Sequence, residues 1–334
     1  MRISTQQMYR QSTDSLMRSL SELYRLNEQI SSGKRINKPS DDVTGISRAM
    51  DYKVSIAAGE RYLGNVSDAT SAITAAESAL SSVNTALTRV RALAVQGASD
   101  STGASSRAAL AEEVGQLRDQ ILSLANSKAG SRYLFSGFRT DAPAFDASYA
   151  YQGDAGAVNM AVGDGVLIPK NVTGAAAFGY SLSSEEVVEI ADGRYAHYIP
   201  GSGTTITVEI RDSDDTTVLD SFSFDNAMEM TDLLCSAMEG NDTLRISALL
   251  SPIDAMEDHV NNVRADLGAR LNRLEDQGTR LEDRNLLTEE SLASVEGADI
   301  VATASDLAKA GTVLEAIQAA TAKMLSQSLL DFLD

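Results

Sequence analysis

The sequence predicts a mainly α-helical fold with an inserted α+β domain: an elongated antiparallel helical bundle built from both chain ends, and a small β-rich middle domain. The five prolines leave residues 40–142 and 253–334 free of proline, and three of the five fall within residues 141–250. Because proline ends helices, this distribution separates two helical regions from a mixed middle. Aromatic residues make up only 5% of the chain, which suits thin seams between helices better than a thick globular core.

A first amphipathic helix occupies about residues 1–30. Its apolar residues step by four and three, which places them on one narrow stripe with the geometry of a coiled-coil seam. The stripe consists of Leu16, Leu20, Leu23 and Ile30, with Asn27 at one of its positions. We expect this stripe to act as an assembly seam.

The stretch SSGKRINKPSDD, residues 31–42, then interrupts the helical pattern. Gly33 can adopt the left-handed conformation that ends a helix. The cations Lys34 and Arg35 follow it, where they suit the negative end of the helix dipole. The sequence therefore predicts a chain break at Gly33.

The second half of this stretch predicts the start of the next helix. Pro39 forces the residue before it to be extended. Ser40 or Asp41 can cap the following helix, and Asp41 and Asp42 place negative charge near its positive end. The cations and aspartates could also pair between neighbouring subunits, and an ordinary charged loop is the alternative interpretation.

Two further helices are predicted before residue 141. One covers about residues 57–99, and a loop at residues 99–106 separates it from the next, for which Ser106 is a candidate cap. Both carry heptad spacing. The stripe of the longer helix consists of Ile73, Ala76, Leu80, Val83, Leu87, Val90 and Ala94, and that of the shorter helix of Leu110, Val114, Leu117, Ile121 and Leu124.

The middle of the chain alternates apolar and polar residues, as strands do. Residues 204–211 and 218–224, joined by the turn DSDD, predict a β-hairpin. The short runs AVNMAV and GVLI predict further strands. Residues 226–240 predict a short helix, with Asn226 and Glu229 as its capping box and Gly240 at its end.

Helical patterning returns near residue 251. Ser251 is a plausible cap and Pro252 suits the first helical position. A stripe of Val260, Val263, Leu267, Leu271, Leu274 and Leu281 follows, and a last helix carries Leu307, Leu314, Ile317, Met324 and Leu325. The predicted division is residues 1–45 plus 293–334 as terminal coiled-coil arms, residues 46–140 plus 251–292 as a helical bundle, and residues 141–250 as an inserted outer domain.

The terminal arms offer each other only one seam. A single helix pair is marginally stable in water, because ordering the backbone costs about 1–2 kcal/mol per residue. We expect both arms to be disordered in the monomer and to fold when they stack with other copies.

Composition excludes several classes of partner. The net charge of −19 argues against nucleic acids and against anionic membrane surfaces. No apolar run approaches the length of a transmembrane helix, and the first residues lack the apolar core of a secretory signal. The single cysteine excludes an internal disulfide bond.

The sequence offers no catalytic, cofactor-binding or metal-binding constellation. The only histidines, His197 and His259, are far apart in the sequence, and with Cys235 they cannot form a Cys/His zinc site. GKRINKPS lacks the order of a phosphate-binding loop. We therefore expect no enzyme activity and no cofactor. An enzyme or ligand-binding module in residues 141–250 is the alternative, prompted only by aspartate-rich turns and His197.

Five ordered motifs resemble the bacterial flagellin-like axial protein family. They are SSGKRINKPSDDVTG after the first helix, GSRYLFSGFRTDAPAF at residues 130–145, YQGDAG at 151–156, LGARLNRLE at 267–275 and SLLDFL at 328–333. Within that family, RYLFSG and the ending LLDFLD are similar to proteins of the hook–filament junction, and filament flagellin is the alternative.

The resemblance implies a structural protein of the flagellum that assembles as a short ring between the hook and the filament. Its partners would be hook-associated protein 1, flagellin and neighbouring copies of itself. It would be extracellular, exported by the flagellar type III system without a cleaved signal peptide. Residues 1–36 and roughly 295–334 would form an inner tube, and a spoke would join them to the next layer. The spoke residues are Gly33, Lys34, Arg35, Pro39, Asp41 and Asp42.

The resemblance also implies an export chaperone that binds the C-terminal helix before secretion. An amphipathic helix binds such a partner by laying its apolar face in a groove. The expected face consists of Leu307, Leu314, Ile317, Met324, Leu325, Leu329 and Leu330.

Overall fold

The computed structural model describes the backbone of residues 2–333 and the side chains of residues 7, 9–191 and 193–323. It contains two compact units, Met1–Arg61 with Leu281–Asp334, and Tyr62–Arg280. Helices α2 (Val43–Ala98) and α6 (Thr243–Glu296) contribute residues to both units. The predicted class, mainly α-helical with inserted β structure, is confirmed. The division into arms, bundle and inserted domain stays a prediction.

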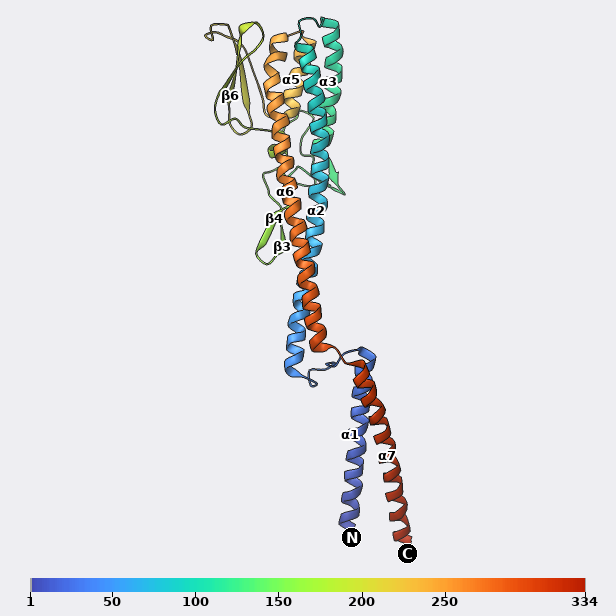
Figure 1. Cartoon of the computed structure of the whole chain (residues 1–334). Coiled ribbons are helices and arrows are strands. Elements are labelled where there is room, and N and C mark those ends of the chain that lie inside the picture. The colour runs from blue at the N-terminus through green and yellow to red at the C-terminus, as the bar shows by residue number, and fades with distance from the viewer. Residues whose placement is uncertain (1, 334) are drawn as a thin grey trace. The chain divides into compact units, whose positions relative to one another are not determined.

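The first unit contains helices from both ends of the chain. Helix α1 (Arg2–Ser32) packs against α7 (Ile300–Leu333). The two helices run antiparallel, so the start of α1 and the end of α7 lie at the same end of the pair (Figure 1). The predicted meeting of the two chain ends is confirmed.

The second unit is built on the predicted α2 stripe. All seven stripe residues from Ile73 to Ala94 are buried. Helix α3 (Ala104–Ala125) buries Val114 and Ile121 of its predicted stripe and packs against α5 (Ala227–Glu239). The capping residue of α5 is Asn226, as predicted, because its side chain accepts hydrogen bonds from the first-turn amides.

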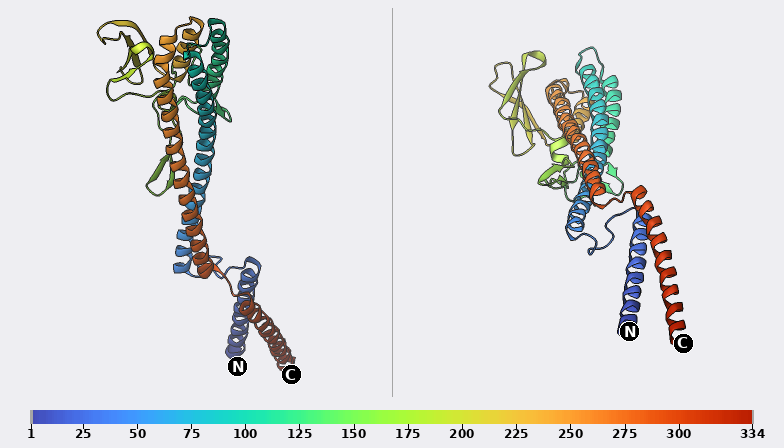
Figure 2. Two further views of the ribbon diagram at one scale, coloured as in Figure 1. Left: turned by 45° about the horizontal axis from the view of Figure 1, so that its top comes forward. Right: turned by 60° about the horizontal axis from the view of Figure 1, so that its bottom comes forward.

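The strands of this unit form three antiparallel sheets. The largest runs in chain order, β5 (Glu186–Glu189), β6 (Tyr195–Pro200), β7 (Ile206–Arg211) and β8 (Val218–Phe224). The predicted β7–β8 hairpin is confirmed, while β5 and β6 were not predicted. In all views α6 lies between this sheet and the helices α2 and α3 (Figures 1 and 2).

The smaller elements lie between α3 and β6 along the chain. The runs AVNMAV and GVLI form a hairpin, β3 (Asn159–Gly163) with β4 (Val166–Pro169), as predicted. A two-residue pair, β1 (Lys128–Ala129) with β2 (Arg132–Tyr133), follows α3. Two short helices complete the unit, α4 (Gly174–Phe178) and η1 (Ala191–Gly193).

The predicted helix start at Ser251 and Pro252 is wrong. Helix α6 begins at Thr243, where the Asp242 side chain accepts the Arg245 amide at 3.1 Å, and Pro252 lies inside it. A proline inside a helix leaves the carbonyl four residues earlier without its donor. Here the Tyr198 hydroxyl donates to that carbonyl, Ala248 O, at 2.8 Å. The sheet therefore supplies the hydrogen bond that the proline removes.

Two other predicted helix starts are also wrong. Ser106 lies inside α3, whose N-cap is Gly103 without a side-chain hydrogen bond. Helix α2 begins at Val43, well before residue 57, because the side chain of Asp42 caps it.

Candidate functional site

The linker between α1 and α2 is held by backbone hydrogen bonds to the segment that joins α6 to α7. Gly33 has a φ of +69° and ends α1, as predicted. Its carbonyl accepts the Ala298 amide at 3.0 Å, and the Arg35 amide donates to the Glu296 carbonyl at 2.7 Å. Lys34 and Gly297 form an antiparallel bridge. The segment that leaves α1 and the segment that leaves α6 therefore run antiparallel as one hydrogen-bonded pair. We call this pair, residues 33–35 with residues 296–298, the crossing.

Glu296 joins this crossing to α2. Its side chain is only 8% exposed, and it forms ion pairs at 2.8 Å with both Lys34 Nζ and Lys53 Nζ. Burial raises the pKa of the Glu296 carboxyl, but the hydrogen bonds and charges of the two lysines lower it more, so the net pKa lies below the ordinary value. The carboxylate is therefore ionised while it holds the two cations together.

The Arg35 guanidinium contacts the end of α6 rather than that of α1. Its Nη2 donates to the Val295 carbonyl at 2.9 Å and lies 3.4 Å from Asp42 Oδ2. The Gln29 side chain in turn donates to the Arg35 carbonyl at 2.8 Å. The predicted favourable position at a negative helix end holds, but the helix is α6. The ion pair with Asp42 lies within the chain.

The two aspartates have different roles. Asp41 Oδ2 accepts the amides of Asn37 and Lys38 at 3.0 and 2.9 Å, which closes the turn that contains the exposed Pro39. Asp42 Oδ1 accepts the Gly45 amide at 2.8 Å and caps α2. These amide donors lower the pKa of both carboxyls. The prediction that Ser40 or Asp41 caps the helix is wrong, because Asp41 is engaged in the preceding turn.

Ile36 anchors the linker and was not predicted. It is 1% exposed, although it stands in a charged stretch. A Cβ on Gly45 would lie 2.5 Å from Ile36 Cδ1, so glycine provides the space for this contact. In the sequence, its burial is indicated only by its being a single apolar residue within a charged stretch.

The predicted stripes of the terminal helices are half-buried. Leu16, Leu20, Leu23 and Ile30 of α1 are all in this state, and the buried Leu26 was not predicted. On α7, the side chains of Leu307, Leu314 and Ile317 are also half-buried. Met324, Leu325, Leu329 and Leu330 lie outside the described side chains. The α1–α7 pair therefore covers only part of each described stripe.

The chemically reactive residue types have structural partners. The nitrogens of His197 lie 2.6 Å from carboxylate oxygens of Glu185 and Asp215, and His259 Nε2 lies 2.8 Å from a backbone carbonyl. Cys235 is buried. Within the described part of the chain, no cluster of histidine, cysteine and acidic residues could hold a metal ion. No helix in that part has an apolar segment long enough to cross a membrane.

Comparison with known proteins identifies the family. The bacterial flagellin N-terminal helical region matches residues 3–140, and the flagellin C-terminal helical region matches residues 250–333. The flagellar hook-associated protein 3 of Escherichia coli is 30% identical over 334 residues, which cover 98% of each chain. This chain belongs to the flagellar hook-associated protein 3 family. The predicted resemblance to flagellin-like axial proteins is confirmed.

Other relatives match shorter parts of the chain. The hook-associated protein 3 of Salmonella typhimurium is 36% identical over 191 residues, 57% of this chain and 60% of that protein. A flagellin of Clostridium tyrobutyricum is 37% identical, but over 100 residues that cover only 30% of this chain and 26% of the flagellin. The match to the Escherichia coli hook-associated protein 3 therefore includes the middle region, and it is more than three times as long as the flagellin match.

Solved structures have the same fold. The flagellar junction protein FlgL of Legionella pneumophila has a TM-score of 0.55 at 21% identity, covering 75% of this chain and 99% of that chain. FlgL of Xanthomonas campestris has a TM-score of 0.56 at 20% identity, covering 72% and 99%. At these identities the likeness shows the shared fold of the hook-associated protein 3 family.

Proposed function

We propose that the protein is a structural adaptor of the bacterial flagellum. It assembles as a short ring between hook and filament, next to hook-associated protein 1, and presents the surface on which flagellin polymerises. The observation that carries this proposal is the full-length match to hook-associated protein 3. Flagellin is the alternative, and the individual flagellins of Clostridium tyrobutyricum and Vibrio parahaemolyticus match only about a third of the chain.

The terminal helices supply the assembly force in this proposal. Their described stripes are half-buried in the single chain, so each apolar residue still has surface to bury. Full burial of a leucine or isoleucine contributes about 1.5–3 kcal/mol. Ordering the backbone costs about 1–2 kcal/mol per residue, so one pair of helices gains little and contacts with several neighbours are needed. The arms would therefore become fully ordered as the ring forms.

The linker acts as the spoke between the inner tube and the next layer. The crossing at Lys34 and Gly297 fixes where both chains leave the terminal helices. Glu296 and Ile36 hold the crossing to the start of α2. A mechanical load on α1 and α7 would thus pass to α2 and α6 through the hydrogen bonds of the crossing and the ion pairs of Glu296.

Export would precede assembly. The protein would leave the cell through the growing flagellum by the type III system, without a cleaved signal peptide, and reside outside the cell. A single cysteine and the absence of a disulfide pair suit a chain that travels unfolded or partly folded. Its final place would be the hook–filament junction.

A chaperone would cover the C-terminal helix until export. The half-buried stripe of α7 that includes Leu307, Leu314 and Ile317 is the face on which it would dock. Deleting residues 300–334 should abolish binding to the chaperone in a pull-down assay. Undiminished binding would place the chaperone site elsewhere. Because the same face would later pack in the inner tube, chaperone binding and assembly should exclude each other.

Deletion of the gene in its host tests the proposed function. Cells without the protein should build hooks but no filaments, and flagellin should accumulate in the medium because it has no surface on which to polymerise. Normal filaments would contradict the proposal. If the protein were itself the filament subunit, the deletion would remove the main filament protein from cells and medium alike.

A further inference from the structure

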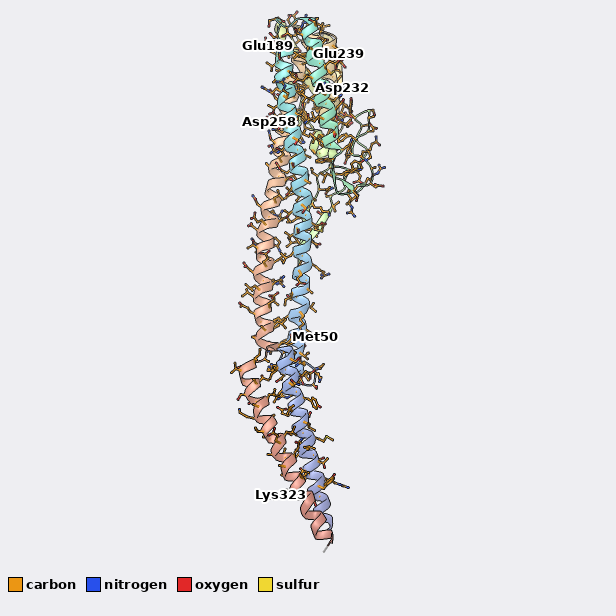
Figure 3. All side chains as sticks on the ribbon, turned by 90° about the vertical axis from the view of Figure 1, so that its right-hand side faces the viewer. Met50, Glu189, Asp232, Glu239, Asp258 and Lys323 are labelled. Carbon is orange, nitrogen blue, oxygen red and sulfur yellow. The ribbon has the colours of Figure 1, made fainter. Side chains whose placement is uncertain are left out.

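The first part of α2 carries an apolar seam that no residue in the described part of the chain covers. Its positions are spaced by four and three, the spacing of a coiled-coil seam. They are Val43, Ser47, Met50, Val54, Ala57 and Arg61, all exposed. Val43, Met50 and Val54 are 74%, 62% and 70% exposed. Met50 is labelled on this stretch in Figure 3. We call these six residues the α2 seam.

The last part of α6 carries a second exposed line with the opposite charge. Asp283, Leu287, Glu290 and Ser294 follow the same spacing, and Leu287 is 63% exposed. We call these residues the α6 seam. The α2 seam ends in a cation, whereas the α6 seam sets a leucine between two acids. In the part of the chain that the structure describes, Arg61, Asp283 and Glu290 have no ion-pair partner.

The surrounding helix surfaces have the same complementarity. Residues 43–61 carry three cations and two acids, while residues 282–294 carry four acids and one cation. Two α6 seams facing each other would oppose carboxylates, which is unfavourable. An α2 seam against an α6 seam brings apolar residues together and places Arg61 among acids.

One chain cannot join its own two seams. Within the chain, α2 and α6 pack through other faces, which include Gly59 and Asn285: a Cβ on Gly59 would lie 2.0 Å from Asn285 Oδ1. The buried positions Ala49, Gly59 and Asn285 lie on the opposite sides of their helices from the seams. The seams are therefore available only to another molecule.

We propose that the α2 seam binds the α6 seam of a second copy of this chain. The contact is heterologous, because different surfaces meet, so a pair of copies keeps one free α6 seam at one end and one free α2 seam at the other. Repetition of a heterologous contact generates a ring or a helical array rather than a closed dimer. The inference rests on the proposed assembly into a ring and adds a lateral contact outside the terminal helices.

Cysteine cross-linking of the full-length protein tests the contact. Leu287→Cys is combined in turn with Val43→Cys, Met50→Cys or Val54→Cys, and assembled flagella are oxidised. At least one pair should give a ladder of dimers, trimers and larger species on non-reducing gels. The control pair is Val95→Cys with Leu287→Cys, since Val95 is an exposed apolar residue on the same helix. It should give no ladder.

The outcomes of this experiment decide between arrangements. The three α2 cysteine variants are also oxidised without Leu287→Cys. A product that stops at dimers and forms in these single variants would show two α2 seams face to face and would overturn the proposal. Monomer alone in all three pairs, in flagella that carry the protein, would also overturn it.

A charge substitution gives a second readout. Val54→Glu should leave export and chaperone binding unchanged but cut swarming motility at least tenfold, because an acid then faces the acidic α6 seam. Val95→Glu should swarm like the wild type. Wild-type swarming of Val54→Glu would overturn the seam while leaving the proposed function intact. Absence of wild-type protein from the flagellum would instead contradict the proposed function.

Discussion

At the scale of single residues, Gly33 shows how one backbone conformation sets the path of the linker. Its φ of +69° is a region that residues with a Cβ rarely adopt, and a Cβ there would meet no neighbouring atom. The sequence predicted this conformation because glycine follows a helical stretch and precedes charged residues. The cost of replacing it should therefore come from the backbone alone.

Gly33→Ala should destabilise the folded chain by about 1–2 kcal/mol, the cost of a left-handed conformation for a residue with a Cβ. Gly33→Asn should cost less, because asparagine tolerates this region. Urea unfolding of the assembled protein, in which the terminal arms are expected to be ordered, measures both by circular dichroism. Equal stability of the alanine variant and the wild type would show that the chain does not need this conformation.

Glu296→Gln should destabilise the crossing at neutral pH by about 1–2 kcal/mol, because two lysines lose their partner. The pKa of Glu296 is lower in the folded chain than the ordinary value of 4.5. Its contribution is therefore present above that value and is lost as the pH falls through the lowered pKa. The difference between variant and wild type should vanish in acid.

Hydrogen exchange of the Arg35 and Ala298 amides in the assembled protein, where these amides donate across the crossing, measures this effect. Faster exchange in the variant at neutral pH, converging with the wild type in acid below the lowered pKa, is the expected result. A difference that persists unchanged in acid would exclude the carboxylate charge as its cause.

Some linker residues were predictable from the sequence and others were not, for a physical reason. Gly33 and the charged residues are recognisable locally, through conformation and dipole. Glu296 and Lys53 meet across 243 positions of sequence, so no local pattern indicates their ion pair. Ile36 lacks periodic apolar neighbours, and its contact with Gly45 becomes evident only in the folded chain.

At the scale of elements, regular heptads were the most predictable feature. The α2 stripe from Ile73 to Ala94 is buried throughout, where other helices of the second unit lie beside it. The α3 stripe was predicted less well, because the buried residues of α3 also include Arg107 and Ala111. Small and charged residues at seam positions carry little apolar signal. The sheet strand β6 was missed because its tyrosines and histidine do not alternate cleanly with polar residues.

The Tyr198 hydroxyl explains how α6 continues through Pro252. Tyr198→Phe should cost about 1–3 kcal/mol, because the buried Ala248 carbonyl then lacks a donor. In a Pro252→Ala background the same change should cost less, since an alanine at this position provides the helical amide. Thermal unfolding of the wild type, the two single variants and the double variant gives the coupling free energy between Tyr198 and Pro252. Identical costs in both backgrounds would show that the hydroxyl does not replace the helical hydrogen bond.

At the scale of the whole molecule, the proposed assembly requires that the terminal helices gain stability from other copies. Their described stripes are half-buried in one chain, whereas the α2 stripe of the second unit is fully buried. The mainly α-helical class and the pairing of the chain ends were predictable from the sequence. The seams between copies were not, since exposure of an apolar residue becomes evident only in the folded chain.

Limited proteolysis of the monomer should trim both ends and leave a core of about residues 45–295. Mass spectrometry of the fragments locates the cuts. In assembled flagella the same sites should be protected, because neighbouring copies bury the terminal stripes. Resistant termini in a protein shown to be monomeric would contradict assembly-dependent ordering of the arms.

The position of the protein on the organelle tests the central claim most directly. Gold-labelled antibody against residues 141–250, viewed on intact flagella by electron microscopy, gives that position. A single narrow band between hook and filament is the predicted result. Label along the whole filament would mean that the protein is a flagellin, and absence of label from flagella on cells that produce the protein would contradict the junction role.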